Sequence, residues 1–93
     1  MAEQTWSRIH DPDADLPYGI NWTAWLAGDT IVTSTWTVSG SGVTLHDDDN
    51  TTTTTIVYAS GGTEGEKYEL INEIVTAGGR TDARLSVLIC ANR

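Results

Sequence analysis

The stretch of sequence that decides the fold is residues 66–91, EKYELINEIVTAGGRTDARLSVLICA. Its first part alternates in polarity, and one side of the expected strand carries Tyr68, Leu70, Asn72 and Ile74. Successive side chains of a strand point to opposite faces, so this period of two predicts a strand with one buried face. Residues 77–80, Ala-Gly-Gly-Arg, then predict a hairpin turn, because glycine takes a positive φ without steric cost.

Residues 83–91 are expected to form the second arm of this hairpin. Apolar side chains alternate here as well, which predicts that one side of the strand faces the core. The expected inward residues are Leu85, Val87 and Ile89, with Arg84 and Ser86 pointing outward. Because these two strands are the most apolar of the chain, the hairpin is predicted to form the middle of one sheet.

Outward from the hairpin, short strand-like segments alternate with turns. Further strands are expected at residues 18–22, 30–38, 43–45 and 51–59. Trp22 and Leu26 are four apart and Gly28 follows, which predicts one short helical turn near residues 23–28. Ile31 breaks the alternation of its strand and indicates a bulge. Six or seven short strands with regular turn signals predict an all-β, antiparallel sandwich.

Residues 1–17 are polar and contain two prolines. Trp6 and Ile9 are the apolar anchors that this stretch offers, either to a short first strand or to an arm that orders on a partner. We therefore divide the chain into an N-terminal arm or first strand, residues 1–17, and a sandwich domain, residues 18–93. Trp6 and Ile9 are the candidate partner-contact residues.

Composition supports one β domain and excludes some partners. The 93 residues include four Trp, three Tyr and no Phe. Thirteen acidic residues against five basic ones give a net charge of -8. A surface that neutralises phosphates needs clustered Lys and Arg, and here they are scattered, so we expect neither nucleic-acid nor membrane binding.

Cys90 is the only cysteine, so no intrachain disulfide is possible. It lies in an apolar run and is expected to be a small buried side chain. The N-terminal residues lack the basic and apolar regions of a signal peptide. Both observations indicate assembly in a reducing cytoplasm.

No constellation of residues predicts catalysis, a cofactor or a metal. His10 and His46 lie in polar segments outside the expected core, and no G-x-S-x-G sequence occurs. Residues 47–50, Asp-Asp-Asp-Asn, are expected to form an acidic, solvated loop. An EF-hand loop would need Asp or Asn at position 51 and Gly at position 52. The chain has Thr51 and Thr52 there, so the EF-hand motif does not match. Cation binding by the loop at Asp47–Asp49 is the open alternative.

The tryptophans have two interpretations. Trp22, Trp25 and Trp36 fall on or beside expected core faces, so packing between sheets is the first. The second is a sugar-binding platform of exposed rings, for which Trp6 and Tyr58 are the candidates.

Two blocks of sequence resemble a small family of structural proteins of tailed bacteriophages and prophages, often labelled fibre–tail adaptors. The first is residues 18–31, YGINWTAWLAGDTI, continued by STWTV at 34–38. The second is residues 60–68, SGGTEGEKY, followed by NEIVT at 72–76 and GRT at 79–81. Each block is weak alone, and the combination is specific.

This resemblance implies an immunoglobulin-like antiparallel β-sandwich used as a virion building block. It brings no catalytic residue, and it places Gly61, Gly62, Gly79 and Arg80 at structural turns. The implied function is an adaptor or accessory subunit that links fibres to tail or neck. Its implied partners are other virion proteins, in several copies around a symmetric assembly, with assembly in the bacterial host cytoplasm.

Two alternatives stay open beside the adaptor. The first is a capsid decoration (cement) protein of the same fold, which copy number distinguishes, and the second is a carbohydrate-binding module. An enzyme is the least favoured function.

Overall fold

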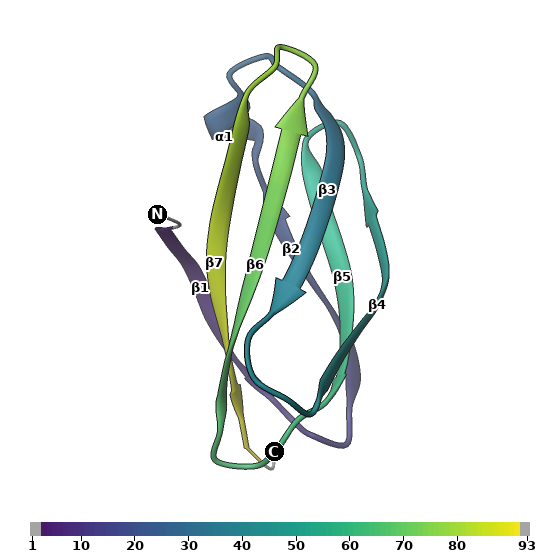
Figure 1. The fold of residues 1–93 in the computed structure, drawn as a ribbon, viewed down its shortest axis with the longest axis vertical. Coiled ribbons are helices and arrows are strands. Elements are labelled where there is room, and N and C mark those ends of the chain that lie inside the picture. The colour runs from purple at the N-terminus through teal and green to yellow at the C-terminus, as the bar shows by residue number, and fades with distance from the viewer. Residues whose placement is uncertain (1–2, 92–93) are drawn as a thin grey trace.

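Seven strands and one short helix make up residues 3–91, the part of the chain that the computed structural model describes. They are β1 (Glu3–His10), β2 (Asp15–Asn21), α1 (Thr23–Leu26), β3 (Ile31–Val38), β4 (Val43–Asn50), β5 (Thr54–Gly61), β6 (Lys67–Thr76) and β7 (Thr81–Cys90). The strands form two sheets packed face to face in a body of 41 × 24 × 19 Å (Figure 1). The expected all-β sandwich and its helical turn are confirmed.

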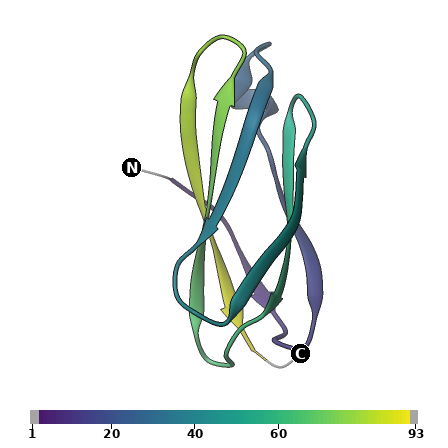
Figure 2. The same ribbon diagram turned by 45° about the vertical axis from the view of Figure 1, so that its right-hand side comes forward.

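One sheet has the strand order β1-β7-β6-β3 and the other has the order β2-β5-β4. All neighbours are antiparallel except β1 and β7, which are parallel, a departure from the fully antiparallel expectation. β1 crosses to the other sheet through residues 11–14, so no hairpin within its own sheet forces it to be antiparallel. Figure 2 shows the two layers side by side.

Of the N-terminal stretch 1–17, residues 1–2 lie outside the described part of the chain, and residues 3–10 form the strand β1. β1 carries His10 into the core, where the ring is fully buried and its Nδ1 lies 2.7 Å from the Tyr18 hydroxyl. The prediction that His10 lies outside the core was wrong. The prediction rested on the polar residues around His10 in the sequence. In the structure one side of β1 packs against β2, and His10 lies on that side.

The β6–β7 hairpin forms the middle of its sheet, as predicted, and β6 buries the predicted side. β7, however, buries the opposite side from the one predicted. Ser86, Leu88 and Cys90 are fully buried, and buried Tyr68 of β6 is the cross-strand partner of Leu88. Pairing partners share a face, so this register turns the other side of β7 outward. The outward residues are Leu85, Val87 and Ile89.

β3 contains the predicted bulge. Its register with β6 shifts between Ile31 and Thr33. As a result Ile31 is buried, whereas Val32 is 58% exposed. The extra residue lets Ile31 and Trp36 both face the core although they are five positions apart.

A buried polar network joins the two sheets at the centre of the molecule. Asn72 Oδ1 of β6 accepts hydrogen bonds from Trp22 Nε1 at 3.0 Å and from the Thr55 hydroxyl of β5 at 2.7 Å. The Asn72 amide group donates to the Ser34 hydroxyl of β3 at 2.9 Å. A buried network in which each of these partners is satisfied gives the sheets one preferred relative position.

Arg80 links the β6–β7 turn to the end of α1, at the top of the molecule in Figure 1. Its guanidinium lies 4.2 Å from the centroid of Trp25, and its Nη2 donates to the Leu26 carbonyl at 2.7 Å. Arg80 Nε also pairs with Asp29 at 3.1 Å. The pKa of Asp29 is lowered to about 2, first by a hydrogen bond from the Thr76 hydroxyl, with backbone N–H groups and Arg80 adding to the effect.

β4 includes the acidic segment that was predicted to be a loop. His46 to Asn50 belong to β4, with a bulge between His46 and Asp49 and a positive φ of 50° at Asp47. The loop prediction was wrong because β4 is an edge strand. Its carboxylates reach water while its backbone pairs with β5, so pairing overrides the poor strand propensity of aspartate.

Candidate docking surface

The outer side of the four-stranded sheet carries a column of apolar side chains along β7. Ile89 is the register partner of Ile9 on β1, and Leu85 is the partner of Ile71 on β6. Partners in a sheet share a face, so these side chains form one surface. We call it the outer apolar face, and define it by Ile9, Ile71, Leu85, Val87 and Ile89.

Solvent reaches every member of the outer apolar face. Ile9 is 53% exposed, and the four other residues are half-buried. Burial of apolar surface against a partner stabilises the complex by about 25 cal/mol for each Å² that is removed from water. A contiguous apolar surface of this kind is typical of a site for another protein.

The border of the outer apolar face is polar. β6 places Lys67, Glu69 and Glu73 along the outer side of the sheet, and all three are exposed. The adjoining outer positions of β3 are threonines, Thr33, Thr35 and Thr37. An apolar centre with a polar rim is the composition of a protein–protein interface. When a partner binds, a polar rim of this kind surrounds the apolar centre and keeps water out of it.

The structure separates the two predicted partner-contact residues. Ile9 lies on the outer apolar face, beside Ile89. Trp6 instead lies between the sheets: its Nε1 donates to the Gly19 carbonyl at 3.0 Å and its ring stacks on Tyr18 at 5.4 Å. Sequence reasoning missed the β7 residues of the face. The sequence of β7 is apolar on both sides, a pattern typical of strands that are covered on both faces, and this pattern could have indicated an outer contact surface.

The two rings considered as a sugar platform do not share a surface. Trp6 is turned inward against Tyr18. Tyr58 lies on the outer side of β5, 5.7 Å from His46 between ring centroids. The structure does not bring Trp6 and Tyr58 together.

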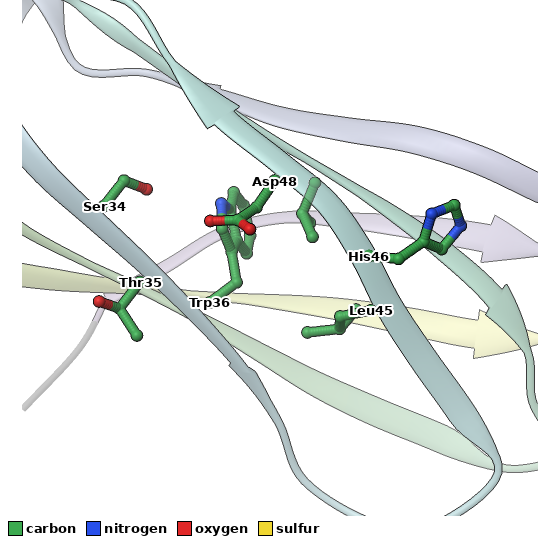
Figure 3. Close-up of a pocket in the computed structure, with 7 residues that line it drawn as sticks. Ser34, Thr35, Trp36, Leu45, His46 and Asp48 are labelled. Atoms are coloured by element: carbon green, nitrogen blue, oxygen red, sulfur yellow. The ribbon is translucent and has the colours of Figure 1, made fainter.

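A concavity of about 330 Å³ opens between β3 and β4, which are the edge strands of the two sheets (Figure 3). Val57 of β5 contributes to its lining. The other lining residues are Ser34, Thr35 and Trp36 of β3 and Leu45, His46 and Asp48 of β4.

His46, at one end of this concavity, is held by two carboxylates. Its Nδ1 lies 2.8 Å from Asp47, and its Nε2 lies 2.8 Å from Asp15 of β2. Both ring nitrogens can donate only when the imidazole is protonated. The hydrogen bond to Asp47, followed by that to Asp15, therefore raises the pKa of His46 above the usual 6.5.

The acidic residues of β4 do not converge on one point. Asp47 binds His46, Asp48 lines the concavity, and Asp49 accepts a hydrogen bond from its neighbour's backbone N–H. Within residues 3–91, no three His, Cys, Asp or Glu side chains gather as metal ligands would. No helix in the same part of the chain is long and apolar enough to cross a bilayer.

An all-β sandwich with an apolar, polar-rimmed outer face is typical of proteins that bind other proteins. Residues 10–89 match the family described as podophage GP4 fiber-tail adaptor protein gp77, and the chain belongs to this family. No individual curated protein matches the chain.

Proposed function

We propose that this protein is a structural subunit of a tailed-phage virion that links fibres to the tail or neck through the outer apolar face. The position of Leu85, Val87 and Ile89 on the outside of the sheet carries the proposal. These half-buried residues leave part of their apolar surface in water in the isolated chain, which is unfavourable, and a bound partner would cover that surface. Membership of the fiber-tail adaptor family supports the same role.

Adaptor function requires binding and no chemistry. The partners are other virion proteins, met in several copies around a symmetric axis, where weak contacts multiply into stable attachment. The net charge of -8 disfavours nucleic acid and anionic membranes as partners. In this proposal the subunit acts without a cofactor, is assembled in the host cytoplasm, and remains in the virion.

The test is incorporation of variants into particles of a phage that lacks its own copy of the gene. Ile89→Glu places a charge in the outer apolar face. The matched control is Ile56→Glu, at an exposed isoleucine on β5 of the other sheet. We expect the Ile89 variant to fold, as judged by its unfolding temperature, and to be lost from particles, while the control is retained.

Normal incorporation of folded Ile89→Glu, with fibres attached, would overturn the docking role of the face. Quantitative mass spectrometry of the particles separates the adaptor from capsid decoration. An adaptor is present at a low, symmetry-related copy number, whereas hundreds of copies on the shell would assign a decoration protein.

A further inference from the structure

β3 is an edge strand of the four-stranded sheet, with β6 on one side and no strand of the described residues on the other. The Ser39 N–H donates to the Glu69 carbonyl of β6 at 2.9 Å, which fixes the alternation of the ladder. Because every second residue of an antiparallel strand bonds to the same neighbour, the backbone groups of Ser34 and Val38 point away from β6. No backbone–backbone hydrogen bond within residues 3–91 reaches these groups. This edge is therefore open to a further strand.

The open edge of β3 lacks the features that normally block an edge strand. From Thr33 to Val38 it contains no charged residue, no proline and no bulge. β4, the edge of the other sheet on the same side of the molecule, instead contains three aspartates and a bulge. Charges, prolines and bulges are the usual protection against an added strand. The absence of all three from this part of β3 is typical of an edge that pairs with another chain.

The strand at the opposite edge of the same sheet, β1, runs in the same direction as β3. β1 is parallel to β7, while β7 and β3 are both antiparallel to β6. A second copy of the chain therefore brings its β1 beside β3 by rotation about an axis along the strands, without being turned over. The two strands then form a parallel pair. Because this contact joins two different edges, it repeats from copy to copy and can close into a ring.

The side of the molecule that carries β1 also carries two arginines. Arg8 of β1 lies 5.6 Å from the centroid of the Trp6 ring, and Arg84 of β7 lies 4.3 Å from that of Trp22. Neither guanidinium forms an ion pair within residues 3–91. Stacking on an indole orients a guanidinium and leaves its N–H groups able to bind a carboxylate. We call Arg8 and Arg84 the cationic side.

The side that carries β3 and β4 has the complementary charge. Asp48 and Asp49 of β4 form no ion pair within the described part of the chain, whereas Asp47 is engaged by His46. We call Asp48 and Asp49 the anionic side. In Figure 1 β1 lies on the left of the sandwich and β4 on the right, so the two sides face away from each other within one copy. They meet when β1 of one copy lies beside β3 of the next.

We propose that this protein associates head to tail with further copies of itself, with β1 of one copy paired to β3 of the next and the cationic side against the anionic side. Backbone pairing supplies affinity, and the opposite charges fix the direction. A two-fold contact between two β3 edges would instead bring the aspartates of two β4 strands together. The outer apolar face lies on the broad side of the sheet and stays open in each copy. The inference thus goes beyond the proposed function.

Sedimentation velocity of the full chain at increasing concentration tests the association. The net charge of -8 opposes it and the contact is confined to edges, so we expect a weak interaction, between about 10 µM and 1 mM at about 0.15 M salt. The mass should rise beyond that of a dimer, because a contact between different edges repeats. A chain that stays monomeric up to 1 mM, or that stops at a dimer as a two-fold contact would, overturns the proposal.

Reversal of charge tests the direction of the contact. Arg8→Glu and Asp48→Arg are each expected to weaken the association about tenfold, because each places like charges across it. The double variant has the natural net charge of -8 and is expected to regain the natural affinity within about threefold. Glu66→Arg, in the exposed connection before β6, makes the same change of charge as Asp48→Arg and should alter the affinity less than about twofold.

The unfolding temperature of each variant shows that it is folded. Failure of the double variant to recover, or a loss in Glu66→Arg equal to that in Asp48→Arg, would show that the two sides do not meet and would overturn the proposal.

Amide hydrogen exchange tests whether β3 is the edge involved. The N–H groups of Ser34 and Val38 should exchange about fivefold more slowly when about four fifths of the chain is associated, while Thr35, which faces β6 in the ladder, is unchanged. Association without protection of Ser34 and Val38 places the contact elsewhere and overturns the proposal. All these measurements use the isolated chain, so their outcome is independent of the particle experiment that tests the adaptor function.

Discussion

Asn72 of β6 holds the Trp22 indole across the interior of the sandwich, with 3.0 Å between Trp22 Nε1 and Asn72 Oδ1. Both side chains are fully buried. The same oxygen accepts from Thr55, so one amide serves as the acceptor for donors that come from the other sheet and its connection.

Replacing Asn72 by Ala is expected to destabilise the fold by about 2–4 kcal/mol, because the buried donors of Trp22 and Thr55 lose their acceptor. Urea unfolding followed by tryptophan fluorescence measures the change. Asn50→Ala, at the half-buried end of the edge strand β4, is the control and should cost less than about 1 kcal/mol. Similar costs for the two variants would contradict a central role for the network.

Gly61 and Gly79 have nearly the same positive φ, 80° and 84°, but different surroundings. A Cβ at Gly61 would lie 2.5 Å from the Gly42 carbonyl oxygen, whereas a Cβ at Gly79 meets nothing within 4 Å. We expect Gly79→Ala to cost about 1–2 kcal/mol of backbone strain, and Gly61→Ala to cost at least about 1 kcal/mol more. Thermal unfolding of both variants checks this order, and a reversed order would contradict it.

Asp29 is expected to make stability depend on acid pH. Its pKa is about 2 in the folded protein and 3.8 in its ordinary state, so the unfolded chain binds the proton more readily. The stabilisation is complete above pH 3.8, declines as pH falls toward 2, and is absent below that. Asp29→Asn should flatten this part of the curve of unfolding temperature against pH. An unchanged curve would contradict the role of Asp29.

His46 is expected to make stability depend on pH in the direction opposite to that of Asp29. Its pKa is raised by Asp47 first and Asp15 second, so its contribution is complete below pH 6.5 and is lost as pH rises through the folded-state pKa. NMR titration of the His46 ring gives this pKa directly. Asp47→Asn should lower the pKa more than Asp15→Asn. A pKa that neither substitution moves would mean that the carboxylates do not hold the protonated ring.

The sequence by itself was sufficient for features that depend on local pattern. Alternation over residues 67–76 predicted β6 and its buried side, and the break at Ile31 predicted the bulge in β3. The burial of Trp22 and Cys90 followed from their apolar surroundings. These features could be predicted because the period of a strand, the freedom of glycine and the hydrophobic effect all act over a few neighbouring residues.

The candidate docking surface was predicted only in part. Ile9 was recognised as an apolar residue in a polar stretch, and the structure places it on the outer apolar face. Trp6 has the same sequence signal and lies between the sheets instead. The concavity beside Asp48 could not be predicted, because it is formed by two edge strands from different sheets.

Only the tertiary structure decided which side of β7 is buried, that β1 runs parallel to β7, and that His10 enters the core. β7 is apolar on both sides, so its own pattern fits either orientation. Pairing of Leu88 with Tyr68 selects one of them. A shift of one residue in register exchanges the two faces of a strand, and register depends on neighbours that are distant in the chain. For that reason the outer apolar face, and the function proposed for it, became visible only in the assembled sandwich.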